Sequence, residues 1–203
     1  EIENRLNANH TNDWANMLPE ERGAILTSIS NDLENEPYEL IYYLMHEAGK
    51  TIQNAIDEIR EAIDFLRYYS KEIIELTKKD NTLEGPTGEI NVLSYSSKGH
   101  FLCISPWNFP VAILIGQISA ALACGNRVTI KPSEHTSILG YLMVQKFHKH
   151  GVPIDALELI LGDGIYGDML SKIKTVKGVA FTGSLETAKK IQTNLNNSHK
   201  EII

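Results

Sequence analysis

The stretch that decides the fold runs from His100 to Lys131 and reads HFLCISPWNFPVAILIGQISAALACGNRVTIK. Short apolar runs at 101–104 and 127–130 predict buried strands, whereas the longer apolar run at 111–124 predicts a helix. A strand, a helix and a second strand in this order indicate a parallel β-α-β unit, because parallel neighbours need a long crossover connection.

The same alternation continues downstream of this stretch. We expect helices at 137–150, 166–173 and 185–195, and strands at 157–161 and 179–181. The fold class is therefore α/β, a Rossmann-like parallel sheet with flanking helices. In such a sheet ligands bind beyond the carboxyl ends of the strands, so the segments that follow the strands carry the candidate chemistry.

A helical segment precedes the sheet. We expect helices at 19–34, 38–49 and 52–76, and turn residues followed by a strand at 89–96. The longest helix carries a stripe of apolar residues at helical spacing, which indicates packing: Ile52, Ile56, Ile59, Ile63 and Leu66. The expected organisation is an N-terminal helical segment at 1–80 and a Rossmann-like domain at 81–203.

The 203 residues include 26 acidic and 19 basic side chains, a net charge of −7, and 42% are hydrophobic. This composition is typical of globular proteins and excludes collagen-like, disordered and disulfide-scaffold classes. The acidic excess argues against a nucleic-acid binder, which usually carries a basic surface. No apolar run reaches the roughly 18 residues of a membrane span, and the first residues lack a secretory signal, so we expect a cytoplasmic protein.

The sequence has two cysteines, Cys103 and Cys124. Neither belongs to a CxxC pair or a Cys/His cluster, so we expect no metal site. A disulfide is not expected in a reducing compartment. Both lie in runs of apolar or small residues, and we expect both to be core thiols.

The first candidate site follows the strand that ends at Ile104, in Ser105-Pro106-Trp107-Asn108-Phe109-Pro110. Two prolines restrict the backbone, two aromatic rings supply rigid walls, and one neutral amide can donate hydrogen bonds. A structural turn and an oxyanion hole explain this pattern equally well. In the second interpretation the Asn108 amide stabilises negative charge that develops during a reaction.

The second candidate site follows the strand that ends at Ile130, in Lys131-Pro132-Ser133-Glu134. Lys131 and Glu134 form either a surface ion pair or a grip on a ribose, with the ammonium as donor and the carboxylate as acceptor. In the second case the charge of Glu134 repels a 2′-phosphate and favours NAD over NADP.

Glycine turns follow two later strands, at Gly162–Gly167 and Thr182–Ser184. Glycine lets a ligand approach the backbone closely, and a helix N-terminus offers N–H groups to a pyrophosphate. Each turn alone is weak evidence, because such turns are common and Gly162–Gly167 does not match the usual G-x-G-x-x-G pattern.

Taken together, these segments resemble the aldehyde dehydrogenase superfamily, with its PWNFP motif at 106–110, its KPSE segment at 131–134 and its FTGS turn at 181–184. A closer resemblance is to the L-glutamate gamma-semialdehyde (1-pyrroline-5-carboxylate) dehydrogenases, including that domain of the bifunctional proline utilization A flavoenzymes. The resembling stretches are EAGKT at 47–51, EIREAIDFLRYY at 58–69, LEGPTGE at 83–89, FLCISPWNFP at 101–110 and GQISAALACGN at 116–126.

The resemblance implies an NAD-dependent oxidation of a small semialdehyde to glutamate in proline catabolism, with Asn108 as the oxyanion donor. It implies cofactor contacts from Ile104, Ser105, Trp107, Lys131, Ser133, Glu134, Gly164, Gly183 and Ser184. FAD would belong to a proline dehydrogenase domain outside this chain. Glu61 and Phe65 would face the substrate entrance or, more simply, pack and face solvent.

The family's nucleophilic cysteine and its general-base glutamate, in a Glu-x-Gly-Gly motif, have no match before Ile203. We therefore expect a fragment that lacks the catalytic domain and has no activity of its own, from a parent that forms a homo-oligomer. Two alternatives remain open: a dehydrogenase for another semialdehyde, and a non-catalytic NAD-binding module.

Overall fold

The computed structural model describes residues 2, 6, 13–78, 82–195 and 201–203. Its helical segment contains α2 (Asp13–Asn16), α3 (Pro19–Asn35), α4 (Tyr38–His46) and α5 (Ile52–Lys78). The strands of the main sheet are β3 (His100–Ile104), β4 (Arg127–Lys131), β5 (Leu157–Leu159), β6 (Val176–Phe181) and β7 (Glu201–Ile202). Between them lie α6 (Ala112–Ala123), the 3-10 turn η1 (Glu134–Thr136), α7 (Ser137–Lys149), α8 (Gly164–Ser171) and α9 (Leu185–Leu195).

The main sheet is parallel, with the strand order β5-β4-β3-β6-β7. The predicted α/β, Rossmann-like fold is therefore confirmed. The chain moves outward from β3 to β5 and then returns to place β6 on the other side of β3. The direction of winding thus reverses between β3 and β6, and this is the position where ligands bind in open α/β sheets.

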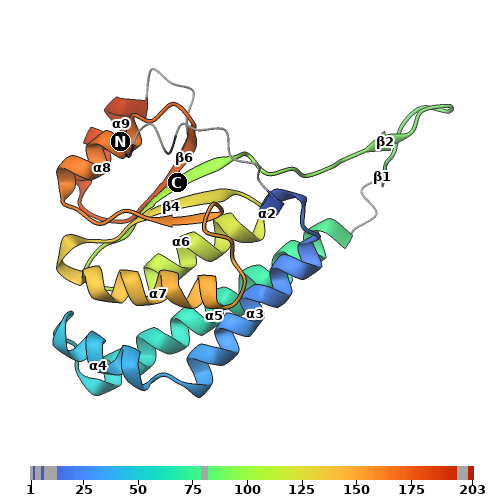
Figure 1. Ribbon diagram of the computed structural model, residues 1–203. Coiled ribbons are helices and arrows are strands. Elements are labelled where there is room, and N and C mark those ends of the chain that lie inside the picture. Colours follow the sequence, from blue (N-terminus) through green and yellow to red (C-terminus); the bar gives the residue numbers. More distant parts are fainter. Residues whose placement is uncertain (1, 3–5, 7–12, 79–81, 196–200) are drawn as a thin grey trace.

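Each face of the sheet has its own apolar core. Cys103 of β3 packs with residues of α6 and α7, whereas its neighbour Leu102 packs with residues of α8 and α9, because successive strand residues point to opposite faces. Figure 1 shows α6 and α7 on one side of the sheet, α8 and α9 on the other, and α3, α4 and α5 as an outer layer. The first of these cores extends into that outer layer.

The helical layer holds α6 at its C-terminal end. The Trp14 indole Nε1 donates to the carbonyl of Leu122 at 2.9 Å, and the buried Arg22 guanidinium donates to the carbonyl of Ala123 at 3.0 Å. The last carbonyls of a helix have no partner within it and carry partial negative charge, so a cation there is favourable.

A carboxylate from the same layer begins α7. Glu47 accepts from the backbone N–H of Ile138 at 2.8 Å with one oxygen and from that of Leu139 at 2.9 Å with the other.

The predicted packing stripe of α5 holds for Ile59, Ile63 and Leu66, which are buried, and Ile56 is half-buried. Ile52 is exposed, because it is the first residue of the helix.

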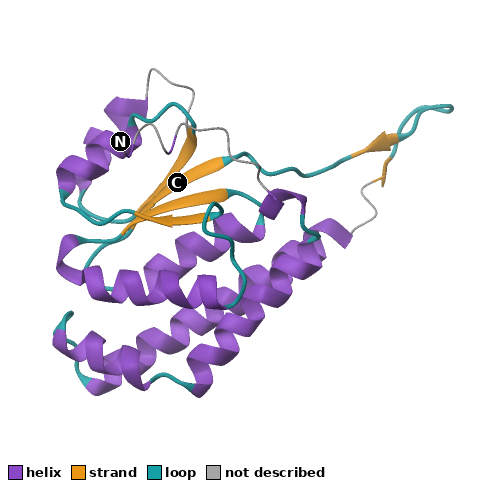
Figure 2. Cartoon of the chain, in the orientation of Figure 1, coloured by secondary structure: helices purple, strands orange, loops and turns teal. Residues whose placement is uncertain are grey.

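The strand expected at 89–96 is much shorter than predicted. Only β2 (Asn91–Val92) is regular, and it pairs antiparallel with β1 (Thr82–Leu83). Together they form an arm that projects from the body (Figure 2). Ile90 is 87% exposed, because none of the described residues forms a second layer against which the alternating residues of the arm can pack.

The prediction that both cysteines are core thiols is correct for Cys103 and wrong for Cys124. Cys124 is the C-cap residue of α6 and lies beside a groove of about 530 Å³. Ile113, Gly116, Ala120 and Cys124 follow at helical spacing and line that groove. The apolar run therefore surrounds the helix, but the side that faces the groove is only partly covered, by side chains such as Phe65.

Within the described ranges, no helix is long and apolar enough to cross a membrane.

An ion cluster on Asp32 links α3 to α7, and it predicts a defined pH dependence of stability. Lys146 lies 2.5 Å and Lys149 3.1 Å from the carboxylate. Partial burial raises the pKa of Asp32, but hydrogen bonds from the two lysines outweigh it and lower this pKa to about 2. A depressed pKa stabilises the folded state above the unfolded pKa, and this contribution disappears as the pH falls from about 4 to about 2.

We expect Asp32→Asn to lower the free energy of unfolding by roughly 1–2 kcal/mol at neutral pH, with a difference that shrinks below pH 4. Denaturant titrations at several pH values measure it. Glu34, like Asp32, lies on α3, and Glu34→Gln removes an exposed ion pair with Arg67 of α5. It is the matched control and should cause no measurable change. A pH-independent loss in Asp32→Asn would contradict the electrostatic explanation.

Candidate functional site

A cleft of about 340 Å³ lies at the carboxyl ends of β3, β4 and β6. Backbone hydrogen bonds keep these ends together: the N–H of Thr182 donates to the carbonyl of Ile104 at 3.1 Å, and the N–H of Ser105 to that of Lys131 at 3.3 Å. The structure brings all nine residues predicted to contact a cofactor into the lining of this cleft: Ile104, Ser105, Trp107, Lys131, Ser133, Glu134, Gly164, Gly183 and Ser184.

Lys131 and Glu134 form an ion pair, as one of the two interpretations of the sequence expected, but its cation is buried rather than at the surface. The Lys131 side chain is 5% exposed, its Nζ donates to the carbonyl of Pro132 at 3.1 Å, and it lies 3.8 Å from the Glu134 carboxylate, which is 48% exposed. Burial lowers the pKa of Lys131, and the charges of Glu134 and Asp163 oppose that shift. The pair thus presents a buried donor and an accessible acceptor to the cleft.

The two glycine turns differ in what they offer an anion. At α8 the Asp163 carboxylate already accepts from the N–H of Ile165 at 2.9 Å, so negative charge occupies the start of that helix. At α9 the cap is neutral, because the N–H of Thr187 donates to the Ser184 hydroxyl at 3.2 Å. A Cβ on Gly183 would lie 2.6 Å from the Phe181 ring, so this turn requires glycine. The start of α9 is therefore the better place for a phosphate.

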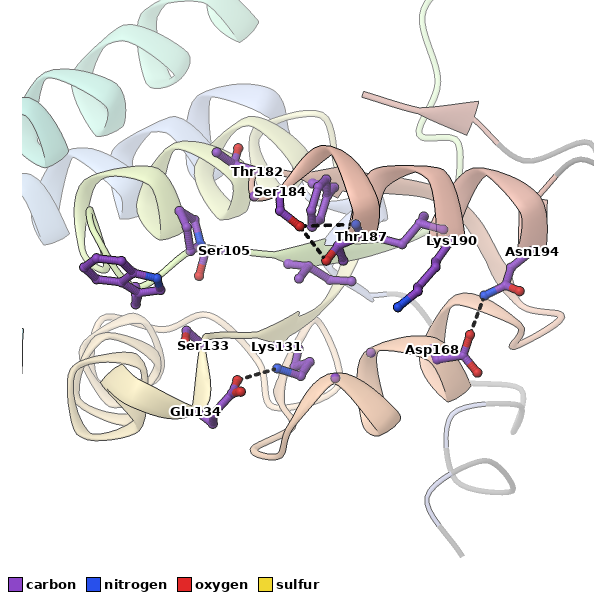
Figure 3. A pocket seen from close by; sticks show the side chains of 18 residues that line it. Ser105, Lys131, Ser133, Glu134, Asp168, Thr182, Ser184, Thr187, Lys190 and Asn194 are labelled. Carbon is purple, nitrogen blue, oxygen red and sulfur yellow. Dashed lines mark hydrogen bonds and ion pairs between the residues drawn. The ribbon is translucent and has the colours of Figure 1, made fainter.

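The outer walls of the cleft include polar residues that were not predicted from the sequence to line it. Thr187, Lys190 and Asn194 line it from α9, opposite Lys131 and Glu134 (Figure 3). The Asn194 amide donates to Asp168 at 2.9 Å and joins α9 to α8 at one end of the cleft. The available signal was that these residues follow Ser184 in successive steps of three or four, which places their side chains on one face of a helix.

Asn108 does not line this cleft. It is exposed and faces a separate cavity of about 440 Å³ between the PWNFP segment and the start of α5. Trp107 lines both spaces and separates them. Of the two residues of α5 considered for a substrate entrance, Glu61 is exposed in the cavity of Asn108, whereas Phe65 stacks on Tyr69 in the groove beside α6.

A buried carboxylate anchors the segment that carries Asn108. Glu58 is 1% exposed, and its Oε1 accepts from the N–H of Val111 at 2.7 Å and from that of Ala112 at 3.2 Å. Its Oε2 lies 2.5 Å from the ammonium of Lys50, which in turn lies 3.9 Å from the centre of the Phe109 ring. Glu58 was not predicted as a functional residue, although a carboxylate between Ala55 and Ala62 on the apolar face of a helix was a signal.

Neither cysteine lines the cleft or the cavity of Asn108. Complete burial raises the pKa of Cys103 to about 12. Partial burial also raises the pKa of Cys124, and the Arg22 charge opposes that shift. Among the residues whose placement is described, no group of three or more His, Cys, Asp or Glu side chains is arranged to hold a metal ion.

Comparison with known proteins gives consistent matches. The sequence matches the aldehyde dehydrogenase family over residues 4–203. It is 42% identical over 183 residues to the bifunctional protein PutA of Salmonella typhimurium, which covers 90% of this chain and 13% of that protein. It is 36% identical over 172 residues to 1-pyrroline-5-carboxylate dehydrogenase 1 of Halalkalibacterium halodurans, which covers 84% of this chain and 33% of the relative.

Solved structures agree with these matches. A structure of proline utilization A from Bradyrhizobium japonicum superposes with a TM-score of 0.91 at 39% identity, over 94% of this chain and 20% of that one. Betaine aldehyde dehydrogenase from Staphylococcus aureus in complex with NAD+ superposes with a TM-score of 0.86 at 27% identity, over 93% of this chain and 37% of that one. The chain thus spans from about an eighth to about a third of the length of the relatives it matches.

Proposed function

The chain belongs to the aldehyde dehydrogenase family, and from this premise we propose that it forms the NAD-binding part of a dehydrogenase that oxidises L-glutamate gamma-semialdehyde to glutamate. The observation that carries the proposal is the single cleft at the ends of β3, β4 and β6 with its cation, carboxylate and glycine turn. The names of the PutA and 1-pyrroline-5-carboxylate dehydrogenase relatives support the substrate. A panel of aldehydes assayed with the complete enzyme tests it, and a higher kcat/KM for another aldehyde would replace it.

The residues of the cleft fit a dinucleotide. Lys131 donates to a ribose hydroxyl and Glu134 accepts from ribose hydroxyls, while the N–H groups at the start of α9 receive the pyrophosphate. Gly164 has no atom within 4 Å of the position of a Cβ, which leaves room along that wall. The cleft volume of about 340 Å³ is within the range of pockets that bind small molecules.

In the proposed reaction a thiolate from outside these 203 residues adds to the aldehyde carbon and produces an alkoxide. The Asn108 amide donates a hydrogen bond to that alkoxide, and Trp107 separates its cavity from the cofactor cleft. Lys131, Glu134 and the start of α9 would hold NAD, which would supply the acceptor for the hydride that leaves the substrate carbon. Loss of the hydride leaves a thioester; water adds to its carbonyl carbon, the C–S bond breaks, and the carboxylate product and the thiol are released.

We also propose that the protein forms a homo-oligomer through the arm at 82–97. Leu83, Ile90, Val92 and Tyr95 are apolar or aromatic, and each is more than half exposed. An exposed two-stranded edge of this kind is a template for pairing with another chain, and a second copy presents the same surface.

The first prediction from the proposed function concerns Glu134, whose charge lies where a 2′-phosphate would approach. We expect a higher kcat/KM with NAD than with NADP, and Glu134→Gln should narrow this preference by about tenfold, which is about 1.4 kcal/mol. Steady-state kinetics with both cofactors measure the ratio. Glu75→Gln, which alters a carboxylate of similar exposure on α5, should leave it unchanged. A preference for NADP would refute the assignment of Glu134.

The second prediction concerns Asn108→Ala in the complete enzyme. Because the amide acts on charge that develops in the transition state, kcat should fall by about 100-fold to 1,000-fold, with NAD affinity little changed. Asn54→Ala removes another exposed amide from the same cavity and should leave kcat unchanged. Turnover near the wild-type rate would return Asn108 to the role of a structural turn.

The third prediction is that the 203-residue chain alone oxidises no aldehyde. Its two thiols have raised pKa values and lie outside the cleft, so neither supplies a thiolate there. NADH formation with glutamate gamma-semialdehyde measures turnover, and calorimetric titration with NAD shows whether the cleft is formed. Turnover that Cys124→Ser abolishes would require a different mechanism, since Cys124 is the exposed thiol.

A further inference from the structure

We propose that Lys50 and Glu58 are positioning residues that hold the backbone around Asn108, an inference that rests on the oxyanion role proposed for Asn108. Neither side chain lines the cofactor cleft, and neither is needed as an acid or base in the proposed reaction. They act through one chain of contacts that leads from the helical layer to the residues on both sides of the PWNFP motif's second proline.

The first link is the Glu58 carboxylate, which is buried between α5 and the start of α6. A single oxygen, Oε1, accepts from the N–H groups of both Val111 and Ala112. These are N–H groups at the start of a helix, where negative charge is favourable. The bond therefore fixes the backbone three and four residues after Asn108.

The second link is the ammonium of Lys50. A buried carboxylate without a countercharge is strongly destabilising, and Lys50 provides that charge 2.5 Å from Oε2. The same ammonium lies over the face of the Phe109 ring, 3.9 Å from its centre, in the geometry of a cation–π contact. Lys50 therefore connects the cap of α6 to the residue that follows Asn108.

The two links restrict the backbone on the C-terminal side of Asn108, and prolines at 106 and 110 restrict it further. An oxyanion donor needs this restriction, because an error of about 1 Å in the position of a catalytic group can cost about 100-fold in rate. Asn108 is exposed, and its side chain has no hydrogen-bond partner among the described residues. Its placement thus depends on the backbone that carries it.

Comparison with Glu47 shows that capping alone does not explain the arrangement. Glu47 caps α7 with both oxygens, one for each N–H group, and needs no aromatic contact. Glu58 serves two N–H groups with one oxygen and keeps the other for Lys50. The additional link to Phe109 is what distinguishes the two caps.

The test is a double-mutant cycle in the complete enzyme. Lys50→Met keeps the aliphatic part of the side chain and removes the charge, and we expect kcat to fall about tenfold with the KM for NAD unchanged. Lys50→Arg keeps the charge and the cation–π contact and should restore most of kcat. In the Asn108→Ala background, Lys50→Met should change kcat by less than about twofold, because both substitutions then disturb the same interaction.

Ser70→Ala is the control for a general loss of stability in α5, since it removes a buried hydrogen bond to the carbonyl of Gly23 far along the helix. It should lower the melting temperature without changing kcat. If Lys50→Met does not fold, Phe109→Leu removes the ring instead and should show the same non-additivity. Independent, multiplicative effects of Lys50→Met and Asn108→Ala on kcat would overturn the inference. An Asn108→Ala enzyme with wild-type kcat would instead overturn the oxyanion role proposed for Asn108, and the aldehyde panel would still test the dehydrogenase activity.

Discussion

The rest of the structure depends on how the two ends of α6 are held. The Glu58 carboxylate receives the first N–H groups of this helix, and the Arg22 guanidinium donates to one of its last carbonyls. Negative charge at the N-terminus and positive charge at the C-terminus both complement the helix dipole. Both groups are buried, so the loss of either would leave unpaired polar groups that water cannot reach.

Because both anchors come from α3 and α5, the helical layer is part of the functional region rather than an appendage to the sheet. The anchored helix fixes the end of the connection from β3 to α6, residues 105–111, while β3 fixes its beginning. Glu47 holds the start of α7 in the same way, directly after the turn that carries Ser133 and Glu134. Two carboxylates of the helical layer therefore control two connections at the ligand-binding edge of the sheet.

Local sequence patterns were sufficient to predict the alternating strands and helices and the position of the cleft at the strand ends. Buried strands such as 101–104 read as apolar runs, and strand ends converge at one edge whatever else the chain does. The anchors of α6 could not be found in this way, because Glu58 and Val111 are 53 residues apart and Trp14 and Leu122 are 108 apart. The prediction that Cys124 is a core thiol failed for a related reason, because an apolar run does not reveal which side of its helix is packed. The short β2 shows that alternating apolar and polar residues form only a short regular strand when no second layer packs against them.

The connection at 105–111 lies between two spaces of the structure, and a third space lies beyond Thr182. Trp107 lines both the cleft at the ends of β3, β4 and β6 and the cavity of Asn108, and Thr182 lines both the cleft and the groove beside α6. The Gln117 amide of α6 donates to the carbonyl of Ile104 at 3.2 Å and to Thr182 at 3.3 Å, which closes the wall between cleft and groove. A shift of α6 along its axis would therefore move a wall of the groove directly, and would reach the other two spaces through Gln117 and the connection at 105–111. Charged groups hold the helix at both ends and an amide holds it in the middle, so these walls are kept in a fixed relation to one another.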